Sequence, residues 1–129
     1  MATSTPGGSQ TNLGLAPNVA GLLCYVPCCL GFVFAVIAAI VEKQSRFVRF
    51  HAFQSLLLHG AVFLLMCGVM VVNTALAMTS LGLIGLLFNL VLMVVGLGLL
   101  AVDVLMMIKA NSGEEFELPV VGKMARQWV

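Results

Sequence analysis

Apolar residues fill three long runs of this chain, and polar residues fall mostly between and after these runs. The runs cover residues 19–41, 50–77 and 81–108. An α-helix rises about 1.5 Å per residue, so the first run alone extends about 34 Å, enough to cross the hydrocarbon core of a bilayer. The pattern therefore predicts an all-α integral membrane protein with three transmembrane helices. An alternative with four spans would need a further break, at Pro27 or between Gly82 and Gly85.

The segments outside these runs predict how the helices begin and end. Residues 1–17 are rich in Ser, Thr, Gly and Pro and predict a polar, flexible N-terminal tail, whereas residues 18–108 form the three-helix membrane domain. Ser45 is placed to N-cap an interfacial helix that leads into the second span. Residues 109–129 are expected to form a short amphipathic segment on the cytoplasmic surface of the membrane. The aromatic side chains expected at the headgroup level are Phe47, Phe50 and Trp128.

All six Lys and Arg residues lie in two segments of the chain. Three fall within residues 42–50 and three fall after residue 108, whereas the turn around Thr79 has none. If the chain crosses the membrane three times, these two segments lie on the same side. Basic residues are enriched in cytoplasmic loops, so the pattern predicts an N-terminus outside and a C-terminus in the cytoplasm.

The composition excludes a soluble domain and a nucleic-acid-binding protein. Hydrophobic residues make up 61% of the chain and charged residues 9%, with a mean hydropathy of +1.13. A soluble domain of this size needs more polar surface. The net charge of +1 leaves no basic face to neutralise a run of phosphates. The expected partners are the lipid bilayer and other membrane proteins, either copies of this chain or subunits of a larger complex.

Polar and small residues inside the second and third runs each fall on one helix face. Polar groups facing lipid tails have no hydrogen-bond partner, so both faces are expected to turn toward protein or toward a wet cavity. One explanation for these faces is that they pack against each other, and the other is that they line a polar path or a cofactor-binding site. The positions are His51, Gln54, Ser55, His59 and Asn73 in the second run, and Gly82, Asn89, Gly96 and Asp103, seven residues apart, in the third.

Asp103 is the one acidic residue well inside an apolar run. Our hypothesis is that it forms an interhelical pair with Arg49 or His51, with Arg46 as a further possible partner, and so fixes the packing of the third helix on the second. The alternative is an aspartate that reaches the membrane interface and pairs with nothing specific.

Two groups of residues are of types that ligate metals or cofactors. His51 and His59 are candidates for axial ligation of a haem or pigment, but eight residues separate them by about 12 Å along a helix, so they cannot hold one metal together. Cys24, Cys28 and Cys29 lack the remaining ligands of a closed zinc shell. The sequence therefore predicts no metal site and no cofactor.

No nucleophile, base and orienting acid follow a recognisable pattern in the sequence, and it contains no phosphate loop or paired zinc motif. The chain is therefore predicted not to be an enzyme. The preferred function is a non-catalytic membrane scaffold or accessory subunit that packs with itself or with a larger membrane complex. The alternative is an oligomeric channel or a component of protein or solute translocation, with a path lined by His51, Ser55, His59 and Asn73.

Several short motifs resemble a known family. They are the run NVAGLLCY at residues 18–25, Glu42 and Lys43, the run RFVRFHAFQS at residues 46–55, and the tail residues Lys109, Ala110, Gly113, Glu114, Phe116, Leu118, Pro119 and Gly122. Together they resemble a small prokaryotic membrane-protein family that includes the magnetosome proteins MamF and MmsF and is similar to the Tic-type import component of the chloroplast inner envelope. The resemblance implies a prokaryotic inner membrane protein, linked either to crystal maturation or to preprotein passage, with no assigned catalytic residue.

Overall fold

The computed structural model describes residues 11–27, 29–79 and 81–129, and the regular structure of these residues is entirely α-helical. The all-α prediction is therefore confirmed. Predictions that involve residues 1–10 of the N-terminal tail, or Cys28, concern positions outside the described residues. The helices are α1 (Pro17–Leu23), α2 (Cys29–Val41), α3 (Arg46–Ala77), α4 (Gly82–Asn111) and α5 (Val121–Arg126).

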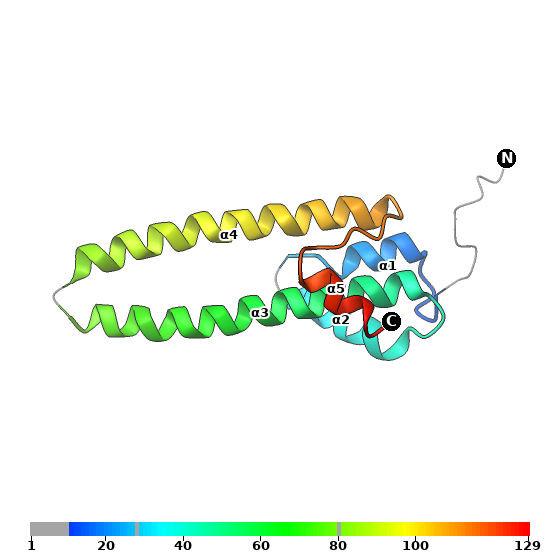
Figure 1. Cartoon of the computed structure of the whole chain (residues 1–129), viewed down its shortest axis with the longest axis horizontal. Helices are drawn as coiled ribbons and strands as arrows, with labels where there is room; N and C mark the ends of the chain where they lie inside the picture. Colours follow the sequence, from blue (N-terminus) through cyan, green and yellow to red (C-terminus); the bar gives the residue numbers. More distant parts are fainter. Residues whose placement is uncertain (1–10, 28, 80) are drawn as a thin grey trace.

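The two longest helices, α3 and α4, form an antiparallel hairpin that extends well beyond the rest of the molecule (Figure 1). They contain 32 and 30 residues, so each is about 45 Å long or longer and exceeds the roughly 30 Å of a bilayer core. Their most apolar 18-residue stretches have mean hydropathies of 2.3 and 2.7, and only 6% of each stretch is buried. Such exposed apolar surface is unlike a core helix of a soluble protein, so lipid is the natural environment of these two helices.

The first apolar run does not form one helix. It is divided into α1, with 7 residues, and α2, with 13 residues. These lengths correspond to about 10 Å and 20 Å, so neither helix crosses a bilayer alone. The prediction of one continuous transmembrane helix over residues 19–41 is therefore wrong, and in the described part of the chain two helices, not three, are long enough to span.

Pro27 and Gly31 explain the break between α1 and α2. Proline has no backbone N–H, and it disfavours helical geometry at the preceding residue, here Val26. The first turn of α2 approaches Val26 so closely that a Cβ on Gly31 would lie 2.2 Å from the Val26 carbonyl oxygen. The chain can therefore turn back at this point only with glycine at position 31.

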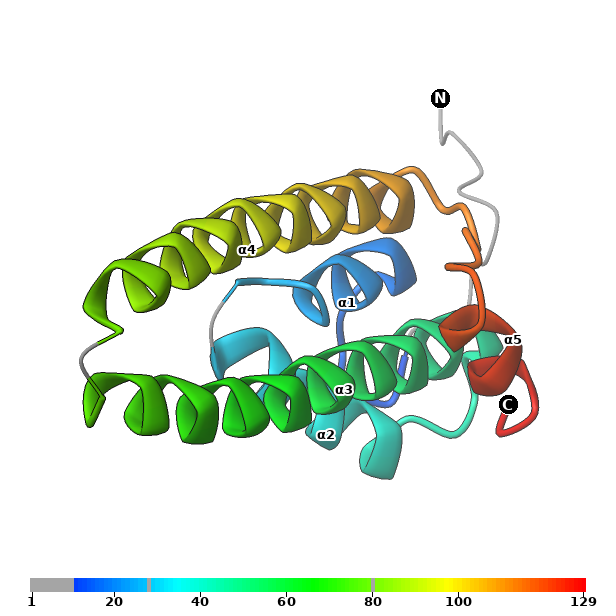
Figure 2. The same cartoon turned by 60° about the vertical axis from the view of Figure 1, so that its left-hand side comes forward.

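The helices α1 and α2 fold back on each other, so the segment that they form begins and ends at one end of the long hairpin. At its start, Asn18 Nδ2 donates to the carbonyl oxygen of Asn111 at 3.2 Å. At its end, Glu42 Oε2 accepts the backbone N–H of Asn12 at 2.8 Å. Figure 2 shows α1 between α3 and α4, and both long helices contact it. The prediction that the N-terminal segment and the loop after the first run lie on opposite sides is therefore wrong.

The start of α3 is confirmed at Ser45, the N-cap residue. Ser45 Oγ accepts the backbone N–H of Val48 at 3.3 Å. The preceding loop is closed by Glu42, a fully buried residue whose Oε1 accepts the N–H groups of Gln44 and Ser45 at 2.9 Å and 2.8 Å. This carboxylate satisfies the backbone of a tight loop, which returns the chain from α2 into α3.

Burial divides the described residues into two regions. We call residues 11–27, 29–55 and 106–129 the basal unit, and residues 56–79 and 81–105 the distal hairpin. Every fully buried residue belongs to the basal unit, and none belongs to the distal hairpin. Small side chains such as Ala20, Ala35 and Ala52 are fully buried in the basal unit, where they permit close helix packing.

Candidate functional site

The basal unit contains a buried hydrogen-bond network centred on the hydroxyl group of Tyr25. Gln54 Nε2 donates to this oxygen at 3.0 Å, and His51 Nδ1 lies 3.3 Å from it. All three residues are fully buried. Tyr25 comes from the turn after α1, whereas His51 and Gln54 come from the first turns of α3. Because unpaired polar groups are costly inside a protein, this network fixes the turn against α3.

The same two α3 side chains hold the C-terminal tail. His51 Nε2 lies 3.2 Å from the carbonyl oxygen of Glu114, which can only accept a hydrogen bond. Gln54 Nε2 also donates to the carbonyl oxygen of Phe116 at 3.1 Å, and Gln54 Oε1 accepts the N–H of Leu118 at 3.1 Å. The tail therefore adds an extended segment to the network, and both ring nitrogens of His51 are engaged within the protein. This leaves His51 no free nitrogen for an axial metal ligand.

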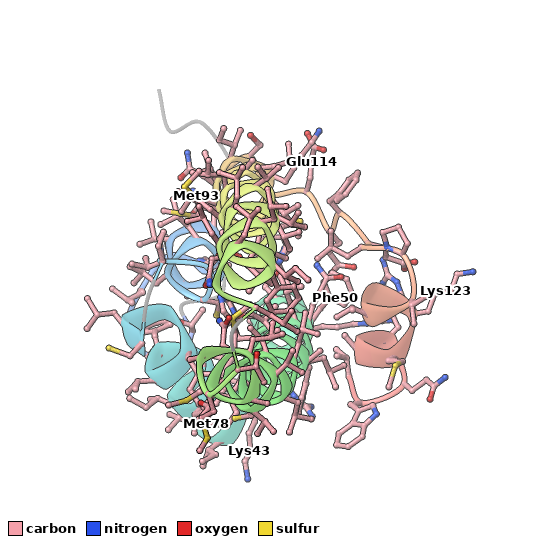
Figure 3. All side chains as sticks on the ribbon, turned by 90° about the vertical axis from the view of Figure 1, so that its left-hand side faces the viewer. Lys43, Phe50, Met78, Met93, Glu114 and Lys123 are labelled. Atoms are coloured by element: carbon pink, nitrogen blue, oxygen red, sulfur yellow. The ribbon has the colours of Figure 1, made fainter. Side chains whose placement is uncertain are left out.

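Helix α5 then covers one side of α3. Gly122 and Ala125 are its buried residues, and a Cβ on Gly122 would lie 2.6 Å from Gln54 Oε1. Glycine is thus needed for the helix to approach the network. Figure 3 shows Phe50 pointing from α3 toward α5, whereas Lys123 points outward.

A salt-bridge cluster holds α5 in place over Phe50. Arg126 pairs with Glu115 at 2.9 Å and with Glu117, and its guanidinium carbon lies 4.7 Å from the centroid of the Phe50 ring. Phe50 is only 1% exposed. The prediction that Phe50 anchors the protein at the membrane interface is therefore wrong, because the folded tail covers it.

The other predicted interface residues have mixed environments. Phe47 is partly buried and its ring centroid lies 4.5 Å from that of His51. Trp128 is 60% exposed, and its carbonyl oxygen accepts a hydrogen bond from Arg49 at 3.1 Å. Arg46 is exposed. Trp128 thus keeps the exposure that a membrane anchor needs, whereas Phe47 belongs mainly to the packing around His51.

A second polar cluster lies deeper along the long helices. His59 Nε2 on α3 is 3.6 Å from Asp103 Oδ2 on α4, and the two side chains are 19% and 14% exposed. His59 Nδ1 lies 2.9 Å from the carbonyl oxygen of Ser55 and 3.1 Å from its hydroxyl oxygen. The hypothesis that Asp103 pairs with Arg49 or His51 is therefore wrong. Both of those residues bond to the C-terminal tail instead.

Ser55, His59 and Asp103 stand in the order of a hydrolytic triad, but the hydrogen bonds do not support that chemistry. The Ser55 hydroxyl donates to the carbonyl oxygen of Cys24, and Ser55 is fully buried. A nucleophilic serine must instead share its hydrogen with the histidine and face a substrate. The arrangement ties the turn after α1 to α3 and α4.

A third polar contact closes the far end of the long hairpin. Asn73 and Asn89 exchange two side-chain hydrogen bonds, each 3.1 Å long. Between this pair and the His59–Asp103 pair, the space beside Gly96 is open, since a Cβ added there would have no atom within 4 Å. The same is true of Gly82. The long helices are thus joined by the His59–Asp103 and Asn73–Asn89 pairs, and the space beside Gly96 of α4 between these pairs is unfilled.

Among the described residues, no group of three or more His, Cys, Asp or Glu side chains could hold a metal ion. Cys24, 0% exposed, donates its thiol to the carbonyl oxygen of Ala20. Cys29 and Cys67 are free and exposed. These three thiols are therefore far from forming a ligand shell, and the polar clusters act chiefly to join helices.

Tyr25 and Glu42 are central to the basal unit, but neither is among the site residues predicted from the sequence. Tyr25 is the one strongly polar side chain in the first apolar run, and Glu42 is the one acid beside it. The isolation of Tyr25 in apolar sequence was an available signal, whereas Glu42 begins the polar segment 42–46. The tail carbonyls that His51 and Gln54 bind carried no such signal, because every residue has one.

The fold and the polar clusters define a helical membrane protein with an internally bonded core at one end. The family model of the magnetosome magnetite crystal formation protein family, MamF/MmsF, matches residues 9–125, and the chain belongs to this family. This confirms the family resemblance drawn from the motifs. The further resemblance to the Tic-type import component stays a prediction.

Curated relatives are described as membrane proteins. A UPF0132 membrane protein of Methanocaldococcus jannaschii is 37% identical over 121 residues, which cover 92% of this chain and 94% of the relative. A UPF0132 membrane protein of Archaeoglobus fulgidus is 34% identical over 112 residues, or 87% and 94% of the two chains. A second M. jannaschii protein is 28% identical over 116 residues, or 90% and 72%. No solved structure matches the chain.

Proposed function

We propose that this protein is a non-catalytic membrane scaffold or accessory subunit, and that its distal hairpin assembles with other transmembrane helices. The observation that carries the proposal is the absence of any buried residue in the described distal hairpin, whereas the basal unit contains every buried residue of the described chain. Membrane helices associate through close packing and interhelical hydrogen bonds, and a lone hairpin offers little of either. A second hairpin, from another copy or a larger complex, would complete the packing.

The surface of the distal hairpin supports such an assembly. The opening at Gly96 allows another helix to approach the backbone of α4 closely, as small residues do at membrane helix interfaces. α3 carries an apolar groove of about 530 Å³. The groove is lined by Cys67, Met70, Val71, Thr74, Ala75 and Met78.

Chemical cross-linking in native membranes, followed by mass measurement after mild detergent extraction, tests the assembly. The informative variant is Gly96→Leu, which fills the opening on α4. Gln44→Leu is the control for added apolar bulk, because Gln44 is an exposed loop residue of the basal unit, outside the distal hairpin. We expect cross-linked species from the wild type and the control, and fewer from Gly96→Leu. A stable monomer of 13.7 kDa under all conditions would contradict the proposal.

The proposed topology has two spans, with both ends of the described chain in the cytoplasm. All six basic residues belong to the basal unit and none to the turn of the hairpin, which favours a cytoplasmic basal unit. A membrane-impermeant thiol reagent distinguishes the arrangements. Ala16→Cys and Lys123→Cys should react from the cytoplasmic side and Thr79→Cys from the other. If Ala16→Cys reacts from the same side of the membrane as Thr79→Cys, the three-span topology is supported instead.

The acidic residues of this chain do not favour the magnetite crystal formation to which the family name refers. Binding of iron at a mineral surface would need carboxylates that are free to coordinate it. Each of the five acidic residues already has a partner within the protein. Glu42 binds backbone N–H groups, Asp103 pairs with His59, Glu114 with Lys109, and Glu115 and Glu117 with Arg126.

The second candidate function is a translocation or channel component, favoured by the non-helical turn between α1 and α2. Broken helices within a membrane are tolerated where they are buried in protein or line a water-filled cavity, and transporters use them in that way. Reconstitution into liposomes loaded with a pH-sensitive or ion-sensitive dye tests this function. Permeability equal to that of protein-free liposomes would rule out the channel function.

A further inference from the structure

The His59–Asp103 pair has a hydrogen-bonding arrangement that determines how many protons it holds. His59 Nδ1 faces two oxygens of Ser55, the backbone carbonyl at 2.9 Å and the hydroxyl at 3.1 Å. The carbonyl oxygen can only accept. The hydroxyl hydrogen is directed to the carbonyl of Cys24, another obligate acceptor, in a short contact that needs a hydrogen between the two oxygens. The Ser55 hydroxyl therefore also acts as an acceptor toward His59.

These contacts require that His59 Nδ1 carries a hydrogen. In a neutral imidazole only one nitrogen is protonated, so Nε2 would present a lone pair. That nitrogen faces Asp103 Oδ2 at 3.6 Å. A neutral histidine beside an ionised aspartate would set two acceptors against each other, in a region where an unpaired carboxylate is costly.

We infer that His59 and Asp103 together form a binding site for one proton within the membrane-embedded part of the protein, and that this proton holds α4 against α3 and the turn after α1. The proton resides either on His59 Nε2, giving an ion pair, or on Asp103, giving a neutral pair. In both forms one residue presents a hydrogen to the acceptor of the other across the 3.6 Å separation. When it leaves to water, the pair gains one negative charge and the two acceptors repel each other.

The neighbouring titratable groups are bonded to other partners and do not share the proton of this pair. From the turn after α1, the Cys24 thiol donates to Ala20 and the Tyr25 hydroxyl is bonded to Gln54. On α3, His51 is engaged with Tyr25 and the tail. On α4, the nearest other charged residue is Lys109, six positions beyond Asp103 and paired with Glu114. None of these groups bonds to the His59–Asp103 pair, so its charge state is set within the pair.

The pair also joins three separate elements. His59 belongs to α3, Asp103 to α4, and Ser55 links His59 to the carbonyl oxygen of Cys24 after α1. Breaking the contact at Asp103 frees α4 at this level, and Asn73–Asn89 is the next polar link, near the far turn. Loss of one proton therefore loosens α4 along much of its length.

The experiment is nuclear magnetic resonance of the full chain in lipid nanodiscs, with ring-labelled histidine and carboxyl-labelled aspartate. Asp103 is the only aspartate and there are two histidines, so His59→Gln assigns the His59 signals. We expect His59 Nδ1 to be protonated throughout, and Nε2 and the Asp103 carboxyl to shift together in one step as the pH rises. Independent titration of the two residues, or a neutral His59 beside an ionised Asp103 at every pH at which the protein is folded, would overturn the inference.

Asp103→Asn supplies the matched variant, because its amide can donate to His59 Nε2 without binding a proton. We expect the joint step of the two residues to be absent from the spectra of this variant. Spin labels introduced as unnatural amino acids at Val19 on α1 and Leu105 on α4 then report helix separation. The wild-type distance distribution should broaden above the titration step and that of Asp103→Asn should not. Equal broadening in both proteins would show that the proton does not hold α4.

Discussion

The basal unit and the distal hairpin share the helices α3 and α4, yet they are stabilised in different ways. In the basal unit, α1, α2 and α5 surround the starts and ends of the long helices, and buried side chains such as Tyr25 and Gln54 bond to several elements at once. In the distal hairpin, the helices expose most of their apolar side chains and are joined by isolated polar pairs. The basal unit is therefore held together by buried contacts between several elements, whereas the distal hairpin has few contacts of its own and exposes its apolar side chains.

This comparison is tested most strongly by placing the same substitution in each region. Gly31→Ala in the basal unit puts a Cβ 2.2 Å from the Val26 carbonyl oxygen, and relief requires movement of the backbone. We expect the free energy of unfolding to fall by about 3 kcal/mol, within the range of overpacked sites. Gly68→Ala in the distal hairpin meets no atom within 4 Å and should stabilise the helix by about 0.5 kcal/mol. Denaturation in mixed micelles measures both, and equal effects would refute the division into two regions.

The next largest effect is expected at Gln54, whose amide makes three hydrogen bonds in the buried network. Gln54→Leu leaves the Leu118 N–H and the Phe116 carbonyl without their partner. We expect a loss of about 2 kcal/mol, the cost of unsatisfied buried groups, and faster hydrogen exchange at Leu118. Gln44→Leu is the control, because Gln44 is an exposed loop residue. Unchanged exchange in Gln54→Leu would mean that the tail is held by other contacts.

A smaller effect is expected where the tail is held by charge at the surface. Arg126→Gln removes the pairs with Glu115 and Glu117 and the contact with Phe50. Since these groups are partly exposed, we expect a loss of about 1 kcal/mol that decreases with added salt. Lys123→Gln changes the same charge on the outward side of α5 and should have little effect. Limited proteolysis of the tail compares the two, and equal cleavage would argue against the cluster.

The smallest effect is expected in the distal hairpin, at the Asn73–Asn89 pair. Asn73→Leu removes two hydrogen bonds between α3 and α4, yet single polar contacts between membrane helices average only about 0.6 kcal/mol. The free energy of unfolding of the monomer should therefore change by about that amount. A loss comparable to that of Gln54→Leu would show that the hairpin is a packed core after all.

The helices that meet lipid were predictable from local sequence. The apolar lengths of α3 and α4 and the Ser45 cap correspond to local patterns, because lipid exposure and capping act on neighbouring residues. The prediction of one continuous helix over the first run was wrong for a different reason. Its length satisfies the rule for a span, but Pro27, the contact of Gly31 with Val26 and the buried Tyr25 together favour two short helices.

The positions of the polar residues were likewise predictable only in part. Their type and spacing indicated that His51, Gln54, Ser55, His59 and Asn73 would avoid lipid, and the described structure pairs each of them. The partners were not predictable. Asp103 meets His59 and not Arg49, because the C-terminal tail folds back and engages Arg49 through the carbonyl of Trp128. That contact joins residues 79 positions apart.

By itself, the sequence determined the all-helical character, the two long apolar helices and the concentration of charge at one end, because hydropathy and helix length act along the chain. Tertiary structure alone decided that the first run turns back on itself, that Phe50 lies beneath α5, and that one proton site forms between α3 and α4. These features depend on which distant groups satisfy one another's hydrogen bonds. That choice is made by the packing of the whole basal unit.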